Sequence, residues 1–187
     1  MNKLFKVAAI SVLTTSASLF VLSIVLHVTG IYINTSASLP IGLYRIVDDH
    51  ISRGAYVAFC PPHSDVFEMA VARGYINPGN CPGGYGQLLK RVFAVAGDTV
   101  AIDQLGIVVN GKLLPNSAPL GIDALGAALP QYRYTAMLSE SEYLLLSDLN
   151  PQSFDARYFG VIDRTQILHV VRPILTFSVN PKEQSYE

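Results

Sequence analysis

Residues 99–114 read TVAIDQLGIVVNGKLL, a pattern typical of antiparallel β-structure. Residues 99–102 and 107–109 are apolar runs rich in β-branched side chains, and each has the length of a short strand. Asn110-Gly111 then precedes Lys112-Leu113-Leu114. Because Asn and Gly both accept a positive φ, this dipeptide is a strong signal for a two-residue hairpin turn. The stretch therefore predicts antiparallel strands joined by tight turns.

Further short apolar runs, separated by turn residues, occur on both sides of this stretch. We expect strands at residues 56–59, 88–95, 143–146 and 167–171. A helical period is weak outside the N-terminal segment and residues 66–73, and residues 115–131 have the Pro and Gly content of a loop. Strands of this length and spacing predict a mainly β domain, an antiparallel sandwich or open barrel.

The composition excludes several classes of protein. Hydrophobic residues make up 50% of the 187 residues and charged residues 14%, so the chain lacks the polar bias of a disordered protein. A formal net charge of −1 offers no clustered basic surface for nucleic acid. The two cysteines have no CxxC or CxxH spacing and the four histidines lie far apart, so we expect neither a metal nor a cofactor.

The N-terminus predicts a membrane segment. Residues 7–33 contain no Asp, Glu, Lys or Arg, whereas Lys3 and Lys6 precede them. A helix of this length exceeds the ~30 Å hydrocarbon core of a bilayer. By the positive-inside rule we expect residues 1–6 in the cytoplasm, residues 7–33 as a transmembrane signal-anchor, and the remainder outside the cytoplasm. A cleaved signal peptide is the alternative, because Ser16-Ala17-Ser18 offers small residues after an apolar run.

Behind this segment we expect one domain, residues 34–180, and a flexible tail, residues 181–187. In an oxidising compartment outside the cytoplasm, two cysteines more often pair than remain free. We therefore expect Cys60 and Cys81 to form a disulfide around a Pro- and Gly-rich loop insertion that lies away from any catalytic core. Two buried thiols are the alternative.

Three segments carry residues suited to chemistry. Ser36 and Ser38, spaced i, i+2 in an extended strand, would project to one face, so that one hydroxyl attacks a carbonyl and the other stabilises the oxyanion. A Ser/Thr-rich linker is the alternative there. Lys90 lies inside an apolar strand, where burial would lower its pKa and suit it as a general base. The alternative is a lysine whose stem reaches solvent from an edge strand.

The third segment contains Ser153, Asp155 and Arg157. Ser153 and Asp155 share a face if the backbone is extended, and Asp155 can pair with Arg157 two residues later. A polar loop after a buried strand is the alternative interpretation.

The order of these segments resembles the type I signal peptidase (leader peptidase) family of Ser/Lys serine proteases. Its Ser-x-Ser-Met box followed by Pro is matched by Ser36-Ala37-Ser38-Leu39-Pro40, and its Lys-Arg-Val…Gly-Asp box by Lys90-Arg91-Val92 and Gly97-Asp98. The Arg-Gly-Asp-x-Val box is matched in part at residues 53–57. The last box survives as Ser147-Asp148-Leu149, then Ser153-Phe154-Asp155-Ala156-Arg157, and Tyr158-Phe159-Gly160 follows it. Pro40-Ile41-Gly42-Leu43-Tyr44 is typical of the TraF branch, which acts in conjugative plasmid transfer.

The resemblance implies a role for each matched residue. Ser38 would be the nucleophile and Lys90 its general base, and Ser36 would donate to the oxyanion beside the backbone N–H of Ser38. Ser153 would hold the lysine amine, and Asp155 would be catalytic in the TraF branch with Arg157 in support. The sequence departs from the family where Leu39 replaces Met and where the last box lacks its Asn and Gly.

The same resemblance implies a function and a location. We expect a membrane-anchored serine endopeptidase of the inner membrane, with a periplasm-facing catalytic domain, or a periplasmic protein if the N-terminal segment is cleaved. Its partner would be an exported protein substrate, the pilin precursor of a conjugation system, cleaved through an acyl-enzyme that can resolve by cyclisation. The alternatives are a general signal peptidase I that removes leader peptides and a non-enzymatic anchored β domain in pilus assembly.

Overall fold

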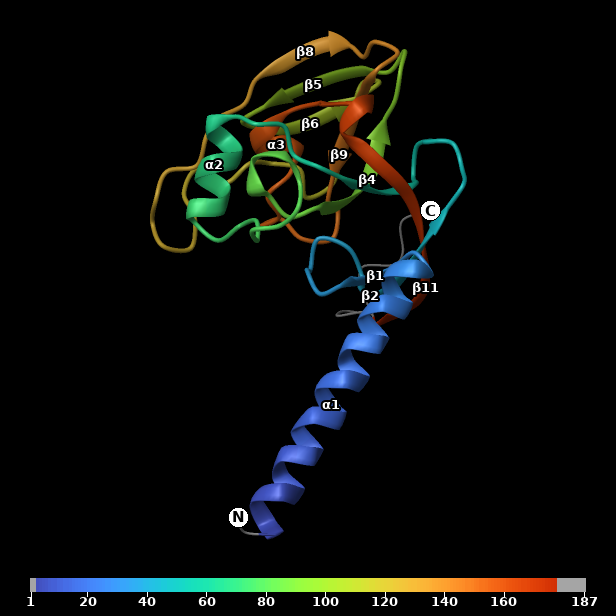
Figure 1. Ribbon diagram of the computed structural model, residues 1–187. Coiled ribbons are helices and arrows are strands. Elements are labelled where there is room, and N and C mark those ends of the chain that lie inside the picture. The colour runs from blue at the N-terminus through green and yellow to red at the C-terminus, as the bar shows by residue number, and fades with distance from the viewer. Residues whose placement is uncertain (1–2, 178–187) are drawn as a thin grey trace.

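The computed structural model describes residues 3–177 of the chain. Residues 178–180 of the predicted domain, the predicted tail 181–187 and the first two residues of the predicted cytoplasmic segment lie outside the described residues. One long N-terminal helix projects from a domain built mainly of strands (Figure 1).

The helices are few and, apart from the first, short. They are α1 (Lys3–Val28), α2 (Asp65–Ala72), α3 (Ala156–Phe159) and the 3₁₀ turns Pro82–Gly84 and Arg164–Gln166. The strands are β1 (Ile31–Asn34), β2 (Ile41–Val47), β3 (Tyr56–Phe59), β4 (Leu88–Ala94), β5 (Thr99–Asp103), β6 (Gly106–Val109), β7 (Lys112–Leu113), β8 (Tyr134–Met137), β9 (Glu142–Leu146), β10 (Ile162–Asp163) and β11 (Ile167–Phe177).

The strands form two antiparallel sheets. The larger has seven strands in the order β1-β2-β11-β3-β4-β9-β10, and the smaller has four in the order β7-β6-β5-β8. The long C-terminal strand β11 pairs with β2 along one edge and with β3 along the other. Segments from the two ends of the domain therefore lie side by side in the larger sheet, which curls across the domain (Figure 1).

The predicted hairpin is confirmed in the smaller sheet. Val109 pairs with Lys112, which leaves Asn110 and Gly111 as a two-residue turn with φ of 50° and 79°. Positive φ at both turn positions is the geometry that an Asn-Gly dipeptide accepts at little cost. Residues 99–114 thus form β5, β6 and β7.

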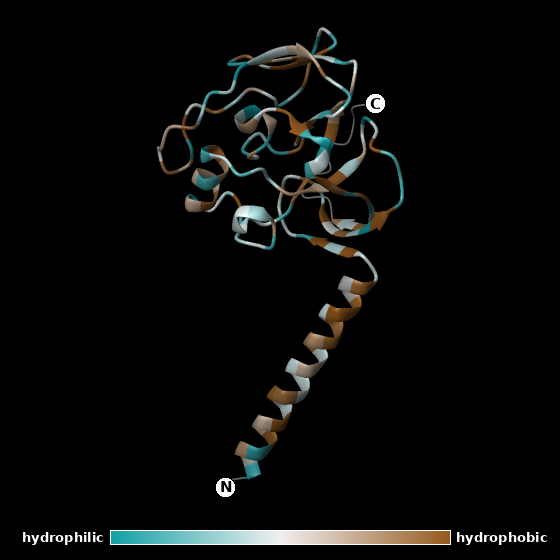
Figure 2. Ribbon diagram, turned by 45° about the horizontal axis from the view of Figure 1, so that its top comes forward, coloured by the Kyte–Doolittle hydropathy of each residue, from teal (hydrophilic) through white to brown (hydrophobic). Residues whose placement is uncertain are grey.

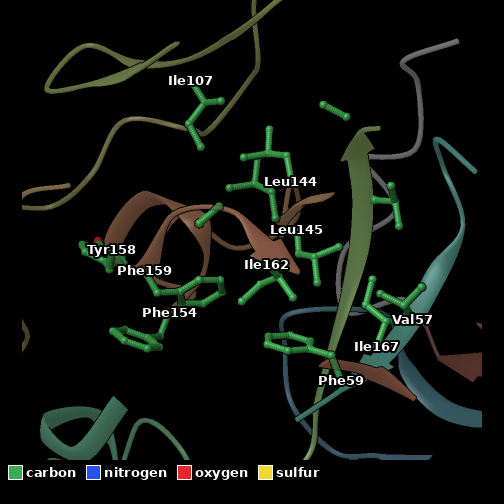
Figure 3. Packing of buried hydrophobic residues seen from close by; sticks show 14 of the residues in the cluster. Val57, Phe59, Ile107, Leu144, Leu145, Phe154, Tyr158, Phe159, Ile162 and Ile167 are labelled. Carbon is green, nitrogen blue, oxygen red and sulfur yellow. The ribbon is translucent and has the colours of Figure 1, made fainter. Parts of the chain in front are cut away.

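The main hydrophobic core lies between the sheets. Val57 and Val92 of the larger sheet belong to the same buried cluster as Ile102 and Ile107 of the smaller sheet. Figure 3 shows part of this packing, including Phe59. A second cluster lies where β2, β3 and β11 meet; we call it the β2 cluster, and its buried members are Leu39, Tyr44, Ala58 and Val171.

The helix α1 stands apart from this core. Its segment Phe5–Val25 is apolar and long enough to cross a membrane, and none of that segment is buried within the protein. Figure 2 shows predominantly hydrophobic colouring along the helix. The helix ends at Val28 and β1 begins at Ile31, so the C-terminal part of the segment expected at residues 7–33 belongs to the sheet. The reason is the pairing of residues 31–34 with β2.

The fold prediction is confirmed: a mainly β, antiparallel domain follows one N-terminal apolar helix. The helix expected at residues 66–73 is α2, at Asp65–Ala72. Residues 115–131 contain no helix and no named strand, as expected of a loop.

Candidate active site

Ser38 lies in the connection between β1 and β2. Strand β1 ends at Asn34 and β2 begins at Ile41, so residues 35–40, which we call the serine loop, join the two strands. Leu39 is only 1% exposed and belongs to the β2 cluster. This buried side chain ties the serine loop to the core beside Ser38, which itself remains partly exposed.

The serine loop is a turn, and the expectation that Ser36 and Ser38 share one face of an extended strand is wrong. The cause is Asn34, which is 5% exposed and binds the loop through its side-chain amide. Its Nδ2 donates to the carbonyl oxygens of Ser36 and Leu39 at 3.0 and 3.1 Å, and its Oδ1 accepts from the backbone N–H of Ser36 at 3.1 Å. These bonds replace the strand ladder. Sequence analysis missed Asn34, although an asparagine directly before a Ser-rich turn is a common turn signal.

The Pro40-to-Tyr44 motif shapes the other end of the serine loop. The Tyr44 hydroxyl donates to the Pro40 carbonyl oxygen at 2.6 Å. A Cβ on Gly42 would lie 2.1 Å from the carbonyl oxygen of Leu175, so only glycine allows β2 and β11 to approach this closely. The motif therefore holds the loop and the strand pairing beneath it.

Lys90 comes from the middle of β4 and meets Ser38 across the larger sheet. Lys90 is 3% exposed, and its strand β4 pairs with β3 on one side and with β9 on the other. Its Nζ lies 2.7 Å from the Oγ of Ser38 and 2.7 Å from the Oγ of Ser153. The two hydroxyl oxygens are 2.9 Å apart. The alternative of a solvent-reaching lysine does not describe this side chain.

Burial lowers the pKa of the Lys90 amine. Desolvation lowers its pKa from 10.5 to about 8; the nearby charge of Asp155 acts in the opposite direction, and that of Arg157 in the same direction. A cation is poorly solvated in such surroundings, so a substantial fraction of the amine is neutral near physiological pH.

Asp155 and Arg157 form a buried ion pair behind this cluster. Both side chains are 0% exposed, and the guanidinium binds the carboxylate in bidentate fashion through Nε and Nη2, each at 2.7 Å. The carboxylate also accepts from the backbone N–H groups of Ser147 at 3.0 Å and Arg157 at 3.2 Å. Arg157 Nη2 also donates to the carbonyl oxygen of Ser153 at 2.9 Å. The pair thus fixes the backbone that presents the Ser153 hydroxyl to Lys90.

A pocket of about 330 Å³ opens beside the hydroxyls of Ser38 and Ser153. Ser36, Ser38 and Ser153 line it, and its apolar lining includes Leu120 and Phe154. The arrangement places a hydroxyl with a basic partner next to an apolar recess of side-chain size. Such a site suits nucleophilic attack on a bound peptide carbonyl.

The structure links Cys60 and Cys81 by a disulfide, as the sequence predicts. The enclosed segment, however, does not lie away from the site. Phe67 of this segment belongs to the main core, and Tyr75 lines the pocket beside Ser38. The segment is integrated because α2 presents an apolar face that the core covers.

Sequence analysis also missed the contact that closes the pocket wall. The Tyr75 hydroxyl donates to the carboxylate of Asp123, which belongs to the 115–131 loop. Arg73 donates to the Ala128 carbonyl oxygen at 2.9 Å, a second link between the same two segments. Tyr75 and Asp123 are 48 residues apart and belong to no shared motif, so only the pocket identifies them as relevant.

The Arg-Gly box at residues 53–57 and the Gly97-Asp98 end of the lysine box lie in another part of the domain. Arg53 forms an ion pair with Asp98, whose carboxylate also accepts from the backbone N–H of Val95 at 2.9 Å and from Asn110 Nδ2 at 2.8 Å. These contacts hold the turn after β4. Among residues 3–177, no three His, Cys, Asp or Glu side chains gather as a metal site requires.

The domain is thus a curled antiparallel β structure in which the hydroxyl oxygen of Ser38 lies 2.7 Å from the buried amine of Lys90. The chain matches the model of the signal peptidase family, peptidase S26, over residues 3–175. The protein belongs to this family.

Individual relatives narrow the comparison. A plasmid transfer protein TraF of Escherichia coli is 44% identical over 178 residues, which cover 95% of this chain and 100% of the relative. A second E. coli plasmid transfer protein TraF is 49% identical over 154 residues, with 81% and 86% covered. A signal peptidase I from Enterococcus faecalis V583, known from its crystal structure, aligns with 65% of this chain and 97% of its own at 18% identity and a TM-score of 0.36.

Proposed function

We propose that the protein is a membrane-anchored serine endopeptidase in which Ser38 is the nucleophile and Lys90 the general base. The observation that carries this proposal is the distance of 2.7 Å between Lys90 Nζ and Ser38 Oγ, with a lysine pKa lowered to about 8. A neutral amine at this distance can accept the hydroxyl proton as Ser38 attacks.

The remaining residues supply the rest of the reaction. Attack on the scissile carbonyl places a negative charge on its oxygen, and the backbone N–H of Ser38 with the hydroxyl of Ser36 would stabilise that charge. The protonated Lys90 then gives its proton to the departing amine, which leaves an acyl-enzyme on Ser38. Ser153 keeps the amine oriented through its 2.7 Å contact, and the Asp155–Arg157 pair supports Ser153.

The proposed substrate is the pilin precursor of a conjugative plasmid transfer system. Relatives named plasmid transfer protein TraF, one of them aligned over 95% of this chain, support the plasmid-transfer part of this proposal. The acyl-enzyme can be resolved by water or by an amine held at high effective concentration. Attack by the N-terminal amine of the same pilin would give a cyclic product.

The proposed location follows from the apolar helix. With α1 in the inner membrane and Lys3 and Lys6 in the cytoplasm, the peptidase domain would face the periplasm. There it would meet exported precursors and an oxidising environment suited to the Cys60–Cys81 disulfide.

Mass spectrometry of a plasmid-encoded pilin, expressed with the wild-type protein or with Ser38→Ala, tests this function. We expect truncation only with the wild type, and a cyclic product one water molecule lighter than the linear product. Truncation of many unrelated exported precursors would instead indicate a general signal peptidase. An unprocessed pilin in both cultures would contradict the proposed function.

A further inference from the structure

Ser36 lies at the edge of the serine loop and its hydroxyl is already engaged. It donates to Asn34 Oδ1 at 2.9 Å, and the backbone N–H of the same residue donates to the same oxygen at 3.1 Å. A serine hydroxyl has one proton, so it cannot donate to Asn34 and to an oxyanion at once. The residue that binds Ser36 at rest therefore influences when its hydroxyl is free.

Among the described residues, every hydrogen bond of the Asn34 side chain goes to the serine loop. The two N–H bonds of Nδ2 are shared among the carbonyl oxygens of Ser36, Leu39 and Pro40, which lie at 3.0, 3.1 and 3.1 Å. The buried amide of Asn34 thus binds both ends of the loop. Because Ser36 lines the pocket beside Ser38, the same amide holds the Ser36 hydroxyl next to that pocket.

We propose that Asn34 is a positioning residue for the reaction and acts through Ser36; this inference rests on the proposed function. Asn34 keeps the Ser36 hydroxyl beside the pocket on a neutral acceptor. When negative charge develops on the scissile carbonyl oxygen, that oxygen becomes the stronger acceptor, because hydrogen bonds to charged groups are about twice as strong as neutral ones. The hydroxyl then rotates from Asn34 to the oxyanion, with no movement of the loop.

Kinetics of the full-length protein in detergent micelles, with a pilin-derived peptide as substrate, test this role. Asn34→Ala should lower kcat by about 10²-fold with little change in KM, as expected when a reacting group is misplaced by about 1 Å. In the Ser36→Ala background the same change should cost only a few-fold, because the group through which Asn34 acts is gone. The inference would be overturned if the losses of kcat in Asn34→Ala and Ser36→Ala simply multiplied in the double variant. An unchanged kcat in Asn34→Ala would overturn it as well.

A matched control separates positioning from loss of stability. Asn110 also makes several side-chain hydrogen bonds, to Thr99 and Asp98, in the distant β6–β7 turn. Asn110→Gly tolerates the positive φ there, so it should lower the melting temperature and leave kcat unchanged. If Asn34→Ala and Asn110→Gly lose kcat equally at equal stability, the effect of Asn34 is merely structural and the inference fails.

Two further arms keep the outcome decisive. Asn34→Asp retains an acceptor for Ser36, whose charge should hold the hydroxyl more tightly, but its carboxylate cannot donate to the loop carbonyl oxygens that Nδ2 binds. Both changes should lower kcat, so a folded Asn34→Asp protein with a wild-type kcat would overturn the inference. If the wild type cleaves no more peptide than Ser38→Ala, the proposed function itself fails. If the wild type is active and Asn34→Ala is equally active, the proposed function stands and only the role of Asn34 is contradicted.

Discussion

Lys90 is buried as completely as the apolar residues around it, and this placement dominates the electrostatics of the site. An ammonium group loses hydration in such surroundings, and its two contacts are neutral hydroxyls. The Asp155–Arg157 pair brings one charge of each sign, and these oppose one another in their effects on the lysine. Desolvation therefore remains the main cause of the lowered pKa.

Replacement of Lys90 by arginine should abolish cleavage as fully as replacement by alanine. A guanidinium stays protonated at any working pH, so it cannot accept the proton of Ser38. Cleavage of a pilin-derived peptide by both variants tests this expectation, with melting temperatures to show that each has folded. Measurable turnover by a folded Lys90→Arg protein would refute the assignment of Lys90 as the base.

Activity and stability should both depend on the titration of Lys90. Activity should rise as pH increases through about 8, where the amine becomes neutral. In the folded state the pKa is about 8, and in the unfolded chain it returns toward 10.5, so the unfolded state binds more protons between these values. The free energy of unfolding should therefore rise with pH across that window.

The size of this stability effect follows from the pKa change. At about 1.4 kcal/mol per pKa unit, it amounts to roughly 3 kcal/mol. The Lys90→Met variant lacks the titrating group, so denaturant titrations from pH 7 to pH 10 should show the wild type gaining on it by up to that amount. A constant difference between the two proteins would contradict the lowered pKa.

The hydroxyl of Ser36 should affect turnover and leave substrate binding unchanged. Loss of one oxyanion donor typically costs about 10²–10³ in rate, so Ser36→Ala should be slow but measurable, whereas Ser38→Ala should be inactive. Ser36→Thr should retain part of the activity because it keeps the hydroxyl. Single-turnover cleavage by the three variants measures this, and a wild-type rate in Ser36→Ala would show that its hydroxyl is no oxyanion donor.

At the scale of elements, the disulfide-bounded segment connects stability to the pocket. It carries α2 into the main core and brings Tyr75 to the pocket wall, where the Tyr75 hydroxyl binds Asp123. The serine loop, by contrast, is held by Asn34 and Tyr44 from the strands on either side. The two walls of the site therefore depend on different local interactions.

The variant with both Cys60→Ser and Cys81→Ser should lose about 3 kcal/mol of stability, as expected for a disulfide that closes a loop of this size. The Ser38–Lys90 contact does not involve the segment, so kcat should change little, while a loosened Tyr75 should raise KM. Denaturant titrations and peptide kinetics measure the two effects. Alkylation of two free thiols in the unreduced wild type would show that the bridge is absent.

At the scale of the whole molecule, the helix and the domain are structurally separate. The apolar segment Phe5–Val25 is unburied, and both hydrophobic clusters consist of residues beyond it. Exposed apolar side chains on a helix of this length are costly in water and favourable in a bilayer.

Deletion of residues 1–29 should leave a folded domain that cleaves a short peptide at close to the wild-type rate. Under the proposed function the same variant should fail to process the precursor in cells, because the helix would bring the domain to its substrate at the membrane. Circular dichroism, peptide kinetics and pilin mass spectrometry report the three properties. Normal processing of the pilin by the truncated domain would show that the helix is not needed for substrate encounter.

The sequence by itself determined the features that depend on a few neighbouring residues. Asn110-Gly111 specifies its turn because both positions tolerate positive φ, and the uncharged N-terminal stretch specifies an apolar helix. The strand that carries Lys90 was also predictable from its apolar neighbours. The motifs identified the family because their order survives even where single residues differ.

Only the tertiary structure decided how these features combine. Ser38 and Lys90 are 52 residues apart, and pairing of β3 between β4 and β11 brings them within hydrogen-bond distance. A local pattern cannot distinguish a lysine that reaches solvent from one enclosed by neighbouring strands, since the stem permits both. An extended strand was expected at Ser36, but this segment is a turn. The side-chain amide of Asn34 is buried against the serine loop and binds the backbone N–H and carbonyl oxygen of Ser36, so it replaces the hydrogen bonds of a strand ladder.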